Sequence, residues 1–266
     1  MIELSDFTKI YKSSSGKKSK KNGFSVDGIS LVVQNQSVTG LIGANGSGKT
    51  TIIKAVCGFH YPSSGKVLVS DYDGTLYDIA QFPEKAMELI GYVPEKTMLP
   101  QEMYVKEFLN YCAGLHNLDS NTKNNALDFV INECDLQEVL GKKIKTLSKG
   151  FGQRVSFAQA LIHNPPNLIF DEPVTGLDPS QIIQMRKLIQ KSAETKAVLL
   201  STHILQEVTS LCTSLFVMNK GKLAASGTEE QIIKQTGTDS LEQAFLKITQ
   251  KNSSIKYTQN EVSTDD

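Results

Sequence analysis

One segment constrains the fold of this chain more than any other. Residues 43–50 read Gly-Ala-Asn-Gly-Ser-Gly-Lys-Thr and fit the pattern G-x-x-x-x-G-K-[ST]. The segment follows an apolar run at 38–42 and opens a helical pattern at 50–58. Glycines let the backbone curl so that successive N–H groups point inward, and the helix start adds a favourable dipole for anions. The sequence therefore predicts a strand, loop and helix that cradle phosphate groups.

The side chains of this loop indicate a nucleotide with a metal ion. Lys49 is expected to neutralise charge on the β- and γ-phosphates, and the Thr50 hydroxyl to coordinate Mg²⁺. The composition of the chain predicts only about 0.02 chance matches to the pattern. The residues predicted to bind the nucleotide here are Gly43, Ala44, Asn45, Gly46, Ser47, Gly48, Lys49, Thr50 and Thr51.

A second acidic segment indicates which reaction follows binding. Residues 167–173 read Asn-Leu-Ile-Phe-Asp-Glu-Pro, a buried strand that ends in two acids. Asp171 is expected to hold the Mg²⁺ shell, and Glu172 to orient or deprotonate a water molecule, which favours hydrolysis over transfer. The alternative is an exposed strand end with solvated acids. Residues 219–222 (Asn-Lys-Gly-Lys) do not match the NKxD that selects guanine, so ATP is the expected nucleotide.

The order of apolar patterns predicts an α/β fold with a parallel sheet. Strands are expected at 1–11, 29–34, 38–42, 65–69, 168–170, 198–200 and 215–218, with helices between several of them. From 104 to 139 the pattern becomes helical, and a short amphipathic helix is expected at 241–248. The apolar faces of the helical region are Val105, Phe108, Leu109 and Cys112, then Ala126, Phe129, Val130 and Cys134.

Composition and charge exclude several classes of protein. Lys plus Arg equals Asp plus Glu at 28 each, so no overall charge draws the chain to nucleic acid or anionic lipid. Its apolar runs are too short to span a bilayer, and the acidic residues near Met1 argue against a secretory signal, so a cytoplasmic location is expected.

Three further features carry structural expectations only. The spacing of Cys57, Cys112, Cys134 and Cys212 fits neither a metal clamp nor a disulfide framework and predicts four buried thiols. Residues 12–21 hold five lysines and four serines and are expected to form a solvated hairpin tip. The polar tail at 252–266 is expected to fray.

Further motifs give the chain a family resemblance. Residues 147–154 (Leu-Ser-Lys-Gly-Phe-Gly-Gln-Arg), 176–178 (Gly-Leu-Asp) and 201–203 (Ser-Thr-His) follow the phosphate loop in a fixed order. Together they resemble the ATP-binding-cassette (ABC) family over residues 1–235, and in wording the gliding-motility-type and multidrug-type exporter subunits. The resemblance implies a P-loop NTPase fold with a mixed β-sheet core, an N-terminal antiparallel β subdomain and a helical subdomain inserted at about 97–160. Residues 236–266 would form a short helix and a polar tail.

The resemblance also implies roles for residues outside the phosphate loop. Ser148 and Gly150 would serve the nucleotide of an opposing subunit, so that two chains sandwich two ATP molecules. Asp178 would carry communication between the paired sites, and His203 would contact the γ-phosphate and the attacking water. Tyr11 resembles the aromatic residue that stacks on adenine, although an ordinary strand tyrosine is the alternative.

Two departures from the family pattern stand out. Glu95, in the segment Gly-Tyr-Val-Pro-Glu, replaces the usual glutamine that touches Mg²⁺ and water, and a carboxylate can still bind the metal. In the signature, Lys149 and Phe151 replace the usual glycine and glutamine. Lys149 either adds a cation near the partner's phosphates or is a solvated side chain.

The expected function is an ATP-hydrolysing subunit of an ABC transporter, with Glu172, His203 and Lys49 as catalytic residues. ATP and Mg²⁺ are the expected cofactors. A second ABC chain, identical or different, and a separate membrane-spanning permease are the expected partners, with the subunit peripheral on the inner face of the membrane. The alternative is a soluble ABC-type clamp that acts on a non-membrane partner.

Overall fold

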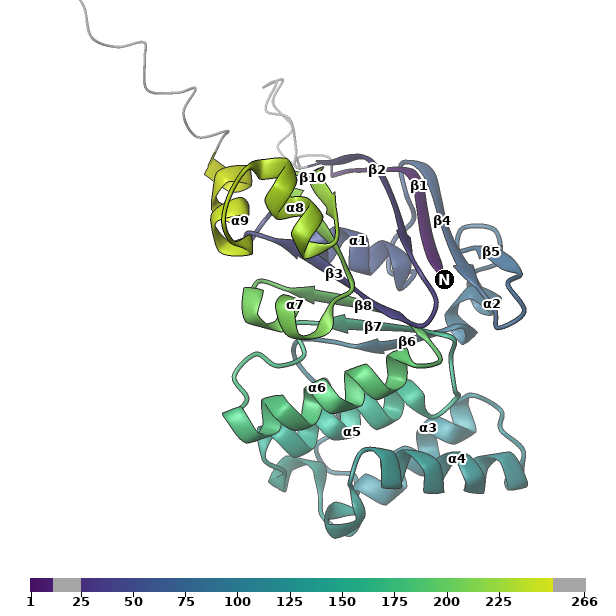
Figure 1. The fold of residues 1–266 in the computed structure, drawn as a ribbon. Coiled ribbons are helices and arrows are strands. Elements are labelled where there is room, and N and C mark those ends of the chain that lie inside the picture. Colours follow the sequence, from purple (N-terminus) through teal and green to yellow (C-terminus); the bar gives the residue numbers. More distant parts are fainter. Residues whose placement is uncertain (12–24, 251–266) are drawn as a thin grey trace, which may run out of the picture.

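The computed structural model describes residues 1–11 and 25–250, which form two sheets with helices around them (Figure 1). The first sheet is antiparallel, with strand order β2-β1-β4-β5. Its strands are β1 (Ile2–Ile10), β2 (Ser25–Val33), β4 (Ser64–Ser70) and β5 (Leu76–Asp78). This is the antiparallel N-terminal sheet that the family resemblance implied.

The second sheet carries the chemistry at one edge. Its strand order is β10-β9-β3-β8-β7-β6, and all pairs are parallel except β10 with β9. The strands are β3 (Ser37–Gly43), β6 (Ile90–Val93), β7 (Asn167–Asp171), β8 (Ala197–Thr202), β9 (Ser214–Asn219) and β10 (Lys222–Gly227). Parallel strands place their carboxyl ends at one edge. The ends of β3, β7 and β8 therefore present the phosphate loop, the paired acids and His203 together.

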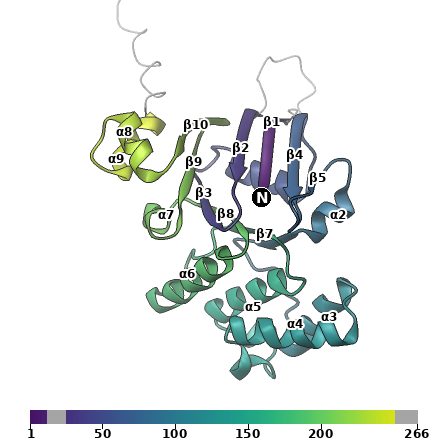
Figure 2. The same cartoon turned by 45° about the vertical axis from the view of Figure 1, so that its right-hand side comes forward.

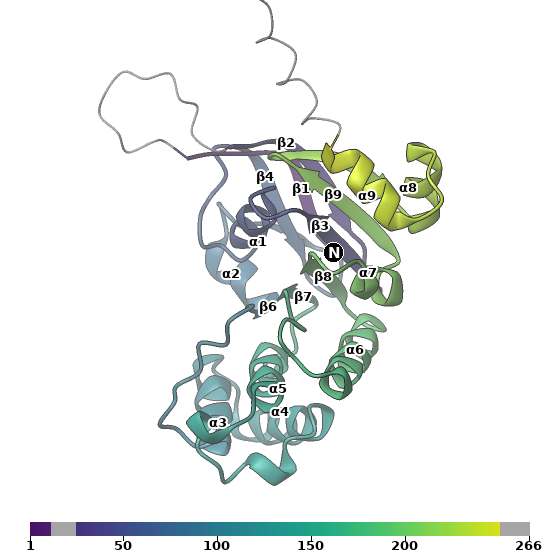
Figure 3. The ribbon, with the colours of Figure 1, turned by 90° about the vertical axis from the view of Figure 1, so that its left-hand side faces the viewer.

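Helices cover both faces of this second sheet, which explains why its central strands are continuous apolar runs. The helix α1 (Lys49–Val56) packs Ile52 and Ile53 into a core shared with the antiparallel sheet. The opposite face is covered by α5 (Lys149–Leu161) and α6 (Pro179–Ala193), whose Phe157 and Met185 join the other main core. Figure 3 shows α1 and these two helices on opposite sides of the sheet.

The expected helical region is present below the sheets, next to α5 (Figure 2). It contains α3 (Val105–Leu115), α4 (Ser120–Glu133) and the short turns η1 (Gln137–Val139) and η2 (Ile144–Thr146). The predicted face of α3 is buried. In α4 the prediction was wrong for Phe129, which is 50% exposed, because Leu127 takes the buried position beside Val130 and Cys134. Ala126 is half-buried.

The C-terminal part packs a third, smaller core against β9. Helices α7 (Leu205–Leu211), α8 (Glu229–Thr236) and α9 (Leu241–Gln250) contribute to it. The helix α9 confirms the amphipathic helix expected at 241–248. The sequence patterns did not predict α8, β5, β6, β10 or α2 (Pro83–Glu88).

The cysteines depart from one expectation. Cys57, Cys112 and Cys134 are buried, but Cys212 is only half-buried. Burial raises the pKa of Cys112 to about 11 and that of Cys212 to about 12, so both thiols stay protonated at neutral pH. The expectations for 12–21 and 252–266 lie outside the described residues. Within the described part of the chain, no helix has the length and apolar character to span a membrane.

Candidate functional site

The loop at residues 44–48 connects the end of β3 to the start of α1 with a backbone that requires glycine. Gly46 and Gly48 have φ angles of 76° and 115°, in the left-handed region that other residues rarely adopt. A Cβ at Gly43 would lie 2.5 Å from the carbonyl oxygen of Met218. No side chain caps the start of α1. Its first N–H groups and the positive end of its dipole are therefore left for an anion.

Two buried polar side chains, one in this loop and one at the first residue of α1, fit a phosphate. Lys49 is 7% exposed, and its Nζ donates to the carbonyl oxygen of Gly43 at 2.7 Å. Burial lowers the pKa of Lys49, while the nearby carboxylates of Glu172 and Asp171 act to raise it. The Ser47 hydroxyl is buried with no hydrogen-bond partner among the described residues. Buried hydroxyls are seldom left unpaired, so this one is suited to a phosphate oxygen.

The paired acids follow β7 directly. Asp171 is its last residue, and burial raises its pKa, with Glu172 and Glu95 acting in the same direction. Glu172 has a φ of 52°, and its N–H donates to the Ser201 carbonyl at 2.9 Å, so it continues the pairing with β8. A glutamate in the left-handed region is a strained residue of the kind found at functional sites. Asp171 therefore ends β7 in extended backbone, whereas Glu172 turns into the left-handed region.

His203 lies next to the second acid. Its Nδ1 is 2.9 Å from Oε2 of Glu172. The Glu172 side chain is 12% exposed and that of His203 is 53% exposed, so the imidazole covers the carboxylate from the solvent side. When Nδ1 carries the proton, it donates to the carboxylate and fixes its orientation. The sequence singled out both residues, but not their direct contact.

These groups surround a cavity of about 230 Å³ lined by residues 45–51, Glu95, Asp171 and Glu172. The donor set fits Mg²⁺ that arrives with a nucleotide. Within the described residues no group of three or more His, Cys, Asp or Glu side chains could hold a metal by itself. Mg²⁺ is usually bound by one or two carboxylates, substrate phosphates and water. Asp171, Thr50 and Glu95 supply oxygens of the right kind beside the phosphate loop.

Four predicted site residues lie apart from this cavity. Tyr11, just after β1, is 39% exposed and its hydroxyl is 3.0 Å from Nε2 of His60. Ser148 is the N-cap of α5, where its hydroxyl accepts from the N–H of Phe151 at 3.4 Å. Gly150 follows in the first turn of α5, and Asp178 caps α6. None of the four lines the cavity, so within one copy they do not meet the phosphate loop.

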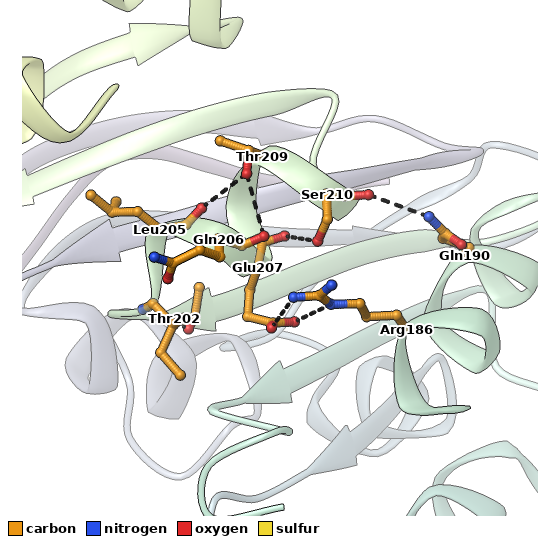
Figure 4. A network of polar contacts seen from close by, with 9 residues as sticks. Arg186, Gln190, Thr202, Leu205, Gln206, Glu207, Thr209 and Ser210 are labelled. Carbon is orange, nitrogen blue, oxygen red and sulfur yellow. Dashed lines mark hydrogen bonds and ion pairs between the residues drawn. The ribbon is translucent and has the colours of Figure 1, made fainter. Parts of the chain in front are cut away.

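An ion pair that sequence reasoning missed links the helix after Asp178 to the helix after His203 (Figure 4). Arg186 on α6 binds Glu207 on α7 with two hydrogen bonds, Nη2 to Oε1 at 2.6 Å and Nε to Oε2 at 3.2 Å. The carboxylate is buried, and the neighbouring Gln190 also donates across the two helices. The partners are 21 residues apart on different helices, so no local pattern pairs them.

Comparison with known proteins gives consistent results. The family model described as "ABC transporter" matches residues 26–175. The chain is 30% identical to the ABC transporter ATP-binding protein NatA of Bacillus subtilis, over 92% of this chain and 97% of that protein. It is 29% identical to YbhF of Escherichia coli, named a probable multidrug ABC transporter ATP-binding protein, over 84% of this chain and 38% of YbhF.

Solved structures show the same fold. An ATP-binding subunit of an ABC transporter superposes with a TM-score of 0.79 at 28% identity, covering 93% of this chain and 98% of that one. A bacterial ABC transporter cassette solved as a dimer superposes with a TM-score of 0.72 at 21% identity, covering 86% of this chain and 98% of that one.

Proposed function

The chain belongs to the ABC transporter family of ATP-binding proteins, and we propose that it hydrolyses ATP as one half of a dimer that drives export through a separate membrane-spanning partner. One observation carries the proposal. The phosphate loop, the acid Asp171 and the pair formed by Glu172 and His203 meet at one edge of the sheet, around a cavity that suits a nucleotide's phosphates. This is a set for hydrolysis, because it includes a candidate base held by a second residue.

The residues divide the reaction between them. The loop N–H groups, the Lys49 ammonium and the Ser47 hydroxyl hold the phosphates and offset their charge. Glu172 accepts the proton of the attacking water, and His203 keeps the carboxylate oriented toward that water. Asp171, Thr50 and Glu95 would hold Mg²⁺, which neutralises developing phosphate charge when bound. Burial of Lys49 and Asp171 strengthens these charge interactions.

A second copy completes the site in this proposal. Ser148 is exposed at the start of α5, Gly150 is buried in its first turn, and Asp178 caps α6. None of them lines the cavity of its own chain. The start of α5 offers a hydroxyl and N–H groups to an anion. A related fold solved as a dimer supports the same arrangement. Each ATP would then be gripped by Lys49 of one copy and by the Ser148 hydroxyl of the other.

Transport requires a further subunit. No helix in the described residues can span a membrane, so in this proposal the ATPase acts from the cytoplasmic face through a permease. The export direction rests on the likeness to a probable multidrug ATP-binding protein. The 105–133 helical region lies away from the antiparallel sheet and is the proposed lever between nucleotide and permease (Figure 2).

The test compares Glu172→Gln with the wild type in phosphate release and in ATP binding. We expect the variant to bind ATP within about threefold of the wild type and to lose at least about 100-fold in turnover. Glu84→Gln, in the exposed first turn of α2, removes a carboxylate of the same kind that does not line the cavity and is the matched control. Turnover by Glu172→Gln at the wild-type rate would refute the assigned base.

A second measurement tests the partner. Purification of the chain from detergent-solubilised membranes should recover a multi-helix membrane protein in stoichiometric amounts. Recovery with ribosomes or DNA alone would contradict the transporter assignment and favour a clamp that acts on a non-membrane partner.

A further inference from the structure

Lys149 makes a contact that links two separate segments of the site. It is the first residue of α5, directly after Ser148. Its Nζ donates to the carbonyl oxygen of Thr175 at 2.5 Å. Thr175 lies in the loop of residues 172–178, which leads from β7 to α6. The side chain is therefore neither simply solvated nor free to reach outward, because it ties the start of α5 to this loop.

The backbone of the loop is shaped around the ammonium group. Gly176 has a φ of 72°, in the left-handed region. The Lys149 ammonium lies against this glycine, 2.3 Å from where a Cβ would be, and the positive φ is what favours glycine here. The ammonium group and the loop backbone are therefore in direct contact.

The same loop is hydrogen-bonded to the backbone of Glu172. The N–H of Thr175 donates to the carbonyl oxygen of Glu172 at 3.3 Å, so both sides of the Thr175 backbone are engaged. One hydrogen bond leads to the residue that would activate water, and the other leads to Lys149. A short chain of hydrogen bonds therefore runs from Glu172 to the residue beside Ser148.

A second contact joins the start of α5 to the far end of the loop. A Cβ at Gly150 would lie 2.4 Å from Cδ of Gln181, so α5 rests directly on this side chain. The N–H of Gln181 donates to Oδ1 of Asp178 at 3.0 Å, and the Asp178 N–H donates back to the Gln181 side chain at 3.4 Å. The starts of α5 and α6 therefore form one packed unit.

We propose that Lys149 is a positioning residue that couples the two ATP sites of the dimer. It fixes Ser148, which serves the partner's nucleotide, to the loop that begins at the chain's own Glu172. A change in the nucleotide bound at one site then shifts Ser148, which contacts the nucleotide at the other site. The inference rests on the proposed function, because only in an ATP-linked dimer do Ser148 and Glu172 serve different nucleotides.

The experiment measures ATP turnover against ATP concentration and fits the Hill coefficient. We expect a coefficient of about 1.5 for the wild type, below the limit of two set by two sites, and about 1 for Lys149→Met. Lys149→Arg keeps a charged donor and should restore about 1.5. The half-saturating ATP concentration should change less than about threefold in Lys149→Met, because monomer binding residues are untouched.

Lys145→Met is the matched control. Lys145 lies four residues before Lys149 and pairs with Glu102 at 2.9 Å on the surface, so its loss removes the same charge without touching the 172–178 loop. Its Hill coefficient should equal that of the wild type. Should Lys149→Met not fold, Lys149→Leu makes the same comparison with a shorter side chain that cannot donate a hydrogen bond.

Three results would overturn the inference. One is a Hill coefficient of 1 in the wild type, and another is retained cooperativity in Lys149→Met. The third is a rise of more than about tenfold in the half-saturating ATP concentration of Lys149→Met that depends on salt and leaves the Hill coefficient unchanged. That result would place the lysine on the partner's phosphates. Failure of the proposed function itself would appear differently, as no ATP-driven dimer of Glu172→Gln.

Discussion

Removing either partner of the ion pair between α6 and α7 should destabilise the chain, but removing Arg186 should cost more than removing the charge of Glu207. The Glu207 side chain is 4% exposed, whereas that of Arg186 is 30% exposed. Arg186→Met leaves a buried carboxylate without its cation, which typically costs about 3–5 kcal/mol. Because the vacated side of the pair is partly exposed and admits water, we expect about 2–4 kcal/mol here. Glu207→Gln leaves a guanidinium that water can reach and should cost only about 1–2 kcal/mol.

Urea unfolding at pH 7 without nucleotide measures both values. A loss of about 3 kcal/mol corresponds to a fall in Tm of about 6–12 °C for a chain of this size. The double variant Arg186→Met with Glu207→Leu should lie within about 1 kcal/mol of the wild type, because no charge is then left buried. Gln190→Met, which removes the other hydrogen bond between the same helices, is the control and should cost about 0.5 kcal/mol.

The reasoning would be refuted if Glu207→Gln cost as much as Arg186→Met, or if the double variant were no more stable than Arg186→Met alone. Lower pH provides an independent check. The unpaired carboxylate in Arg186→Met should have a raised pKa, so its native state takes up a proton as the pH falls. The stability gap to the wild type should therefore shrink between pH 7 and pH 5.

Three further predictions concern the site and its support. Burial raises the pKa of Asp171, so the native state binds more protons than the unfolded chain and loses stability as the pH rises through that pKa. Asp171→Asn should therefore raise the urea midpoint of the nucleotide-free chain at pH 7. This gain should vanish toward pH 4. If the Tyr11 ring stacks on adenine, Tyr11→Leu should weaken ATP binding about 5- to 50-fold by calorimetry, and Tyr111→Leu, at another exposed tyrosine, is the control. Equal ATP affinities of Tyr11→Leu and the wild type would show that Tyr11 does not stack on adenine. Phe170→Ala should cost about 3–5 kcal/mol of stability, because the ring is fully buried with its centroid 5.2 Å from that of Phe157. A loss below about 1 kcal/mol by urea titration would contradict that packing.

The features that sequence predicted well are those written in consecutive residues. The phosphate loop needs glycines where the backbone turns left-handed, and Gly46 and Gly48 do so. The strand before Asp171 is an unbroken apolar run because both of its faces are buried, so its end could be located without knowing its neighbours. Parallel strands then bring their ends together, which placed Asp171, Glu172 and His203 at one edge.

The features that sequence did not predict depend on contacts between distant segments. The choice of Phe129 over Leu127 failed because both residues fit a helical stripe, and only the packing of α4 on its neighbours decides which is buried. The bond from Lys149 to Thr175 spans 26 residues and depends on the shape of a loop. The strand β10 alternates exposed and half-buried residues at a sheet edge, so its pattern is weak.

The most direct test of the account is the mass of Glu172→Gln in solution, measured by sedimentation with and without ATP and Mg²⁺. ATP with Mg²⁺ should double the mass, and Ser148→Arg in the same background should prevent the doubling without loss of ATP binding. A single-copy mass with ATP fully bound would contradict the claim that two copies share each nucleotide.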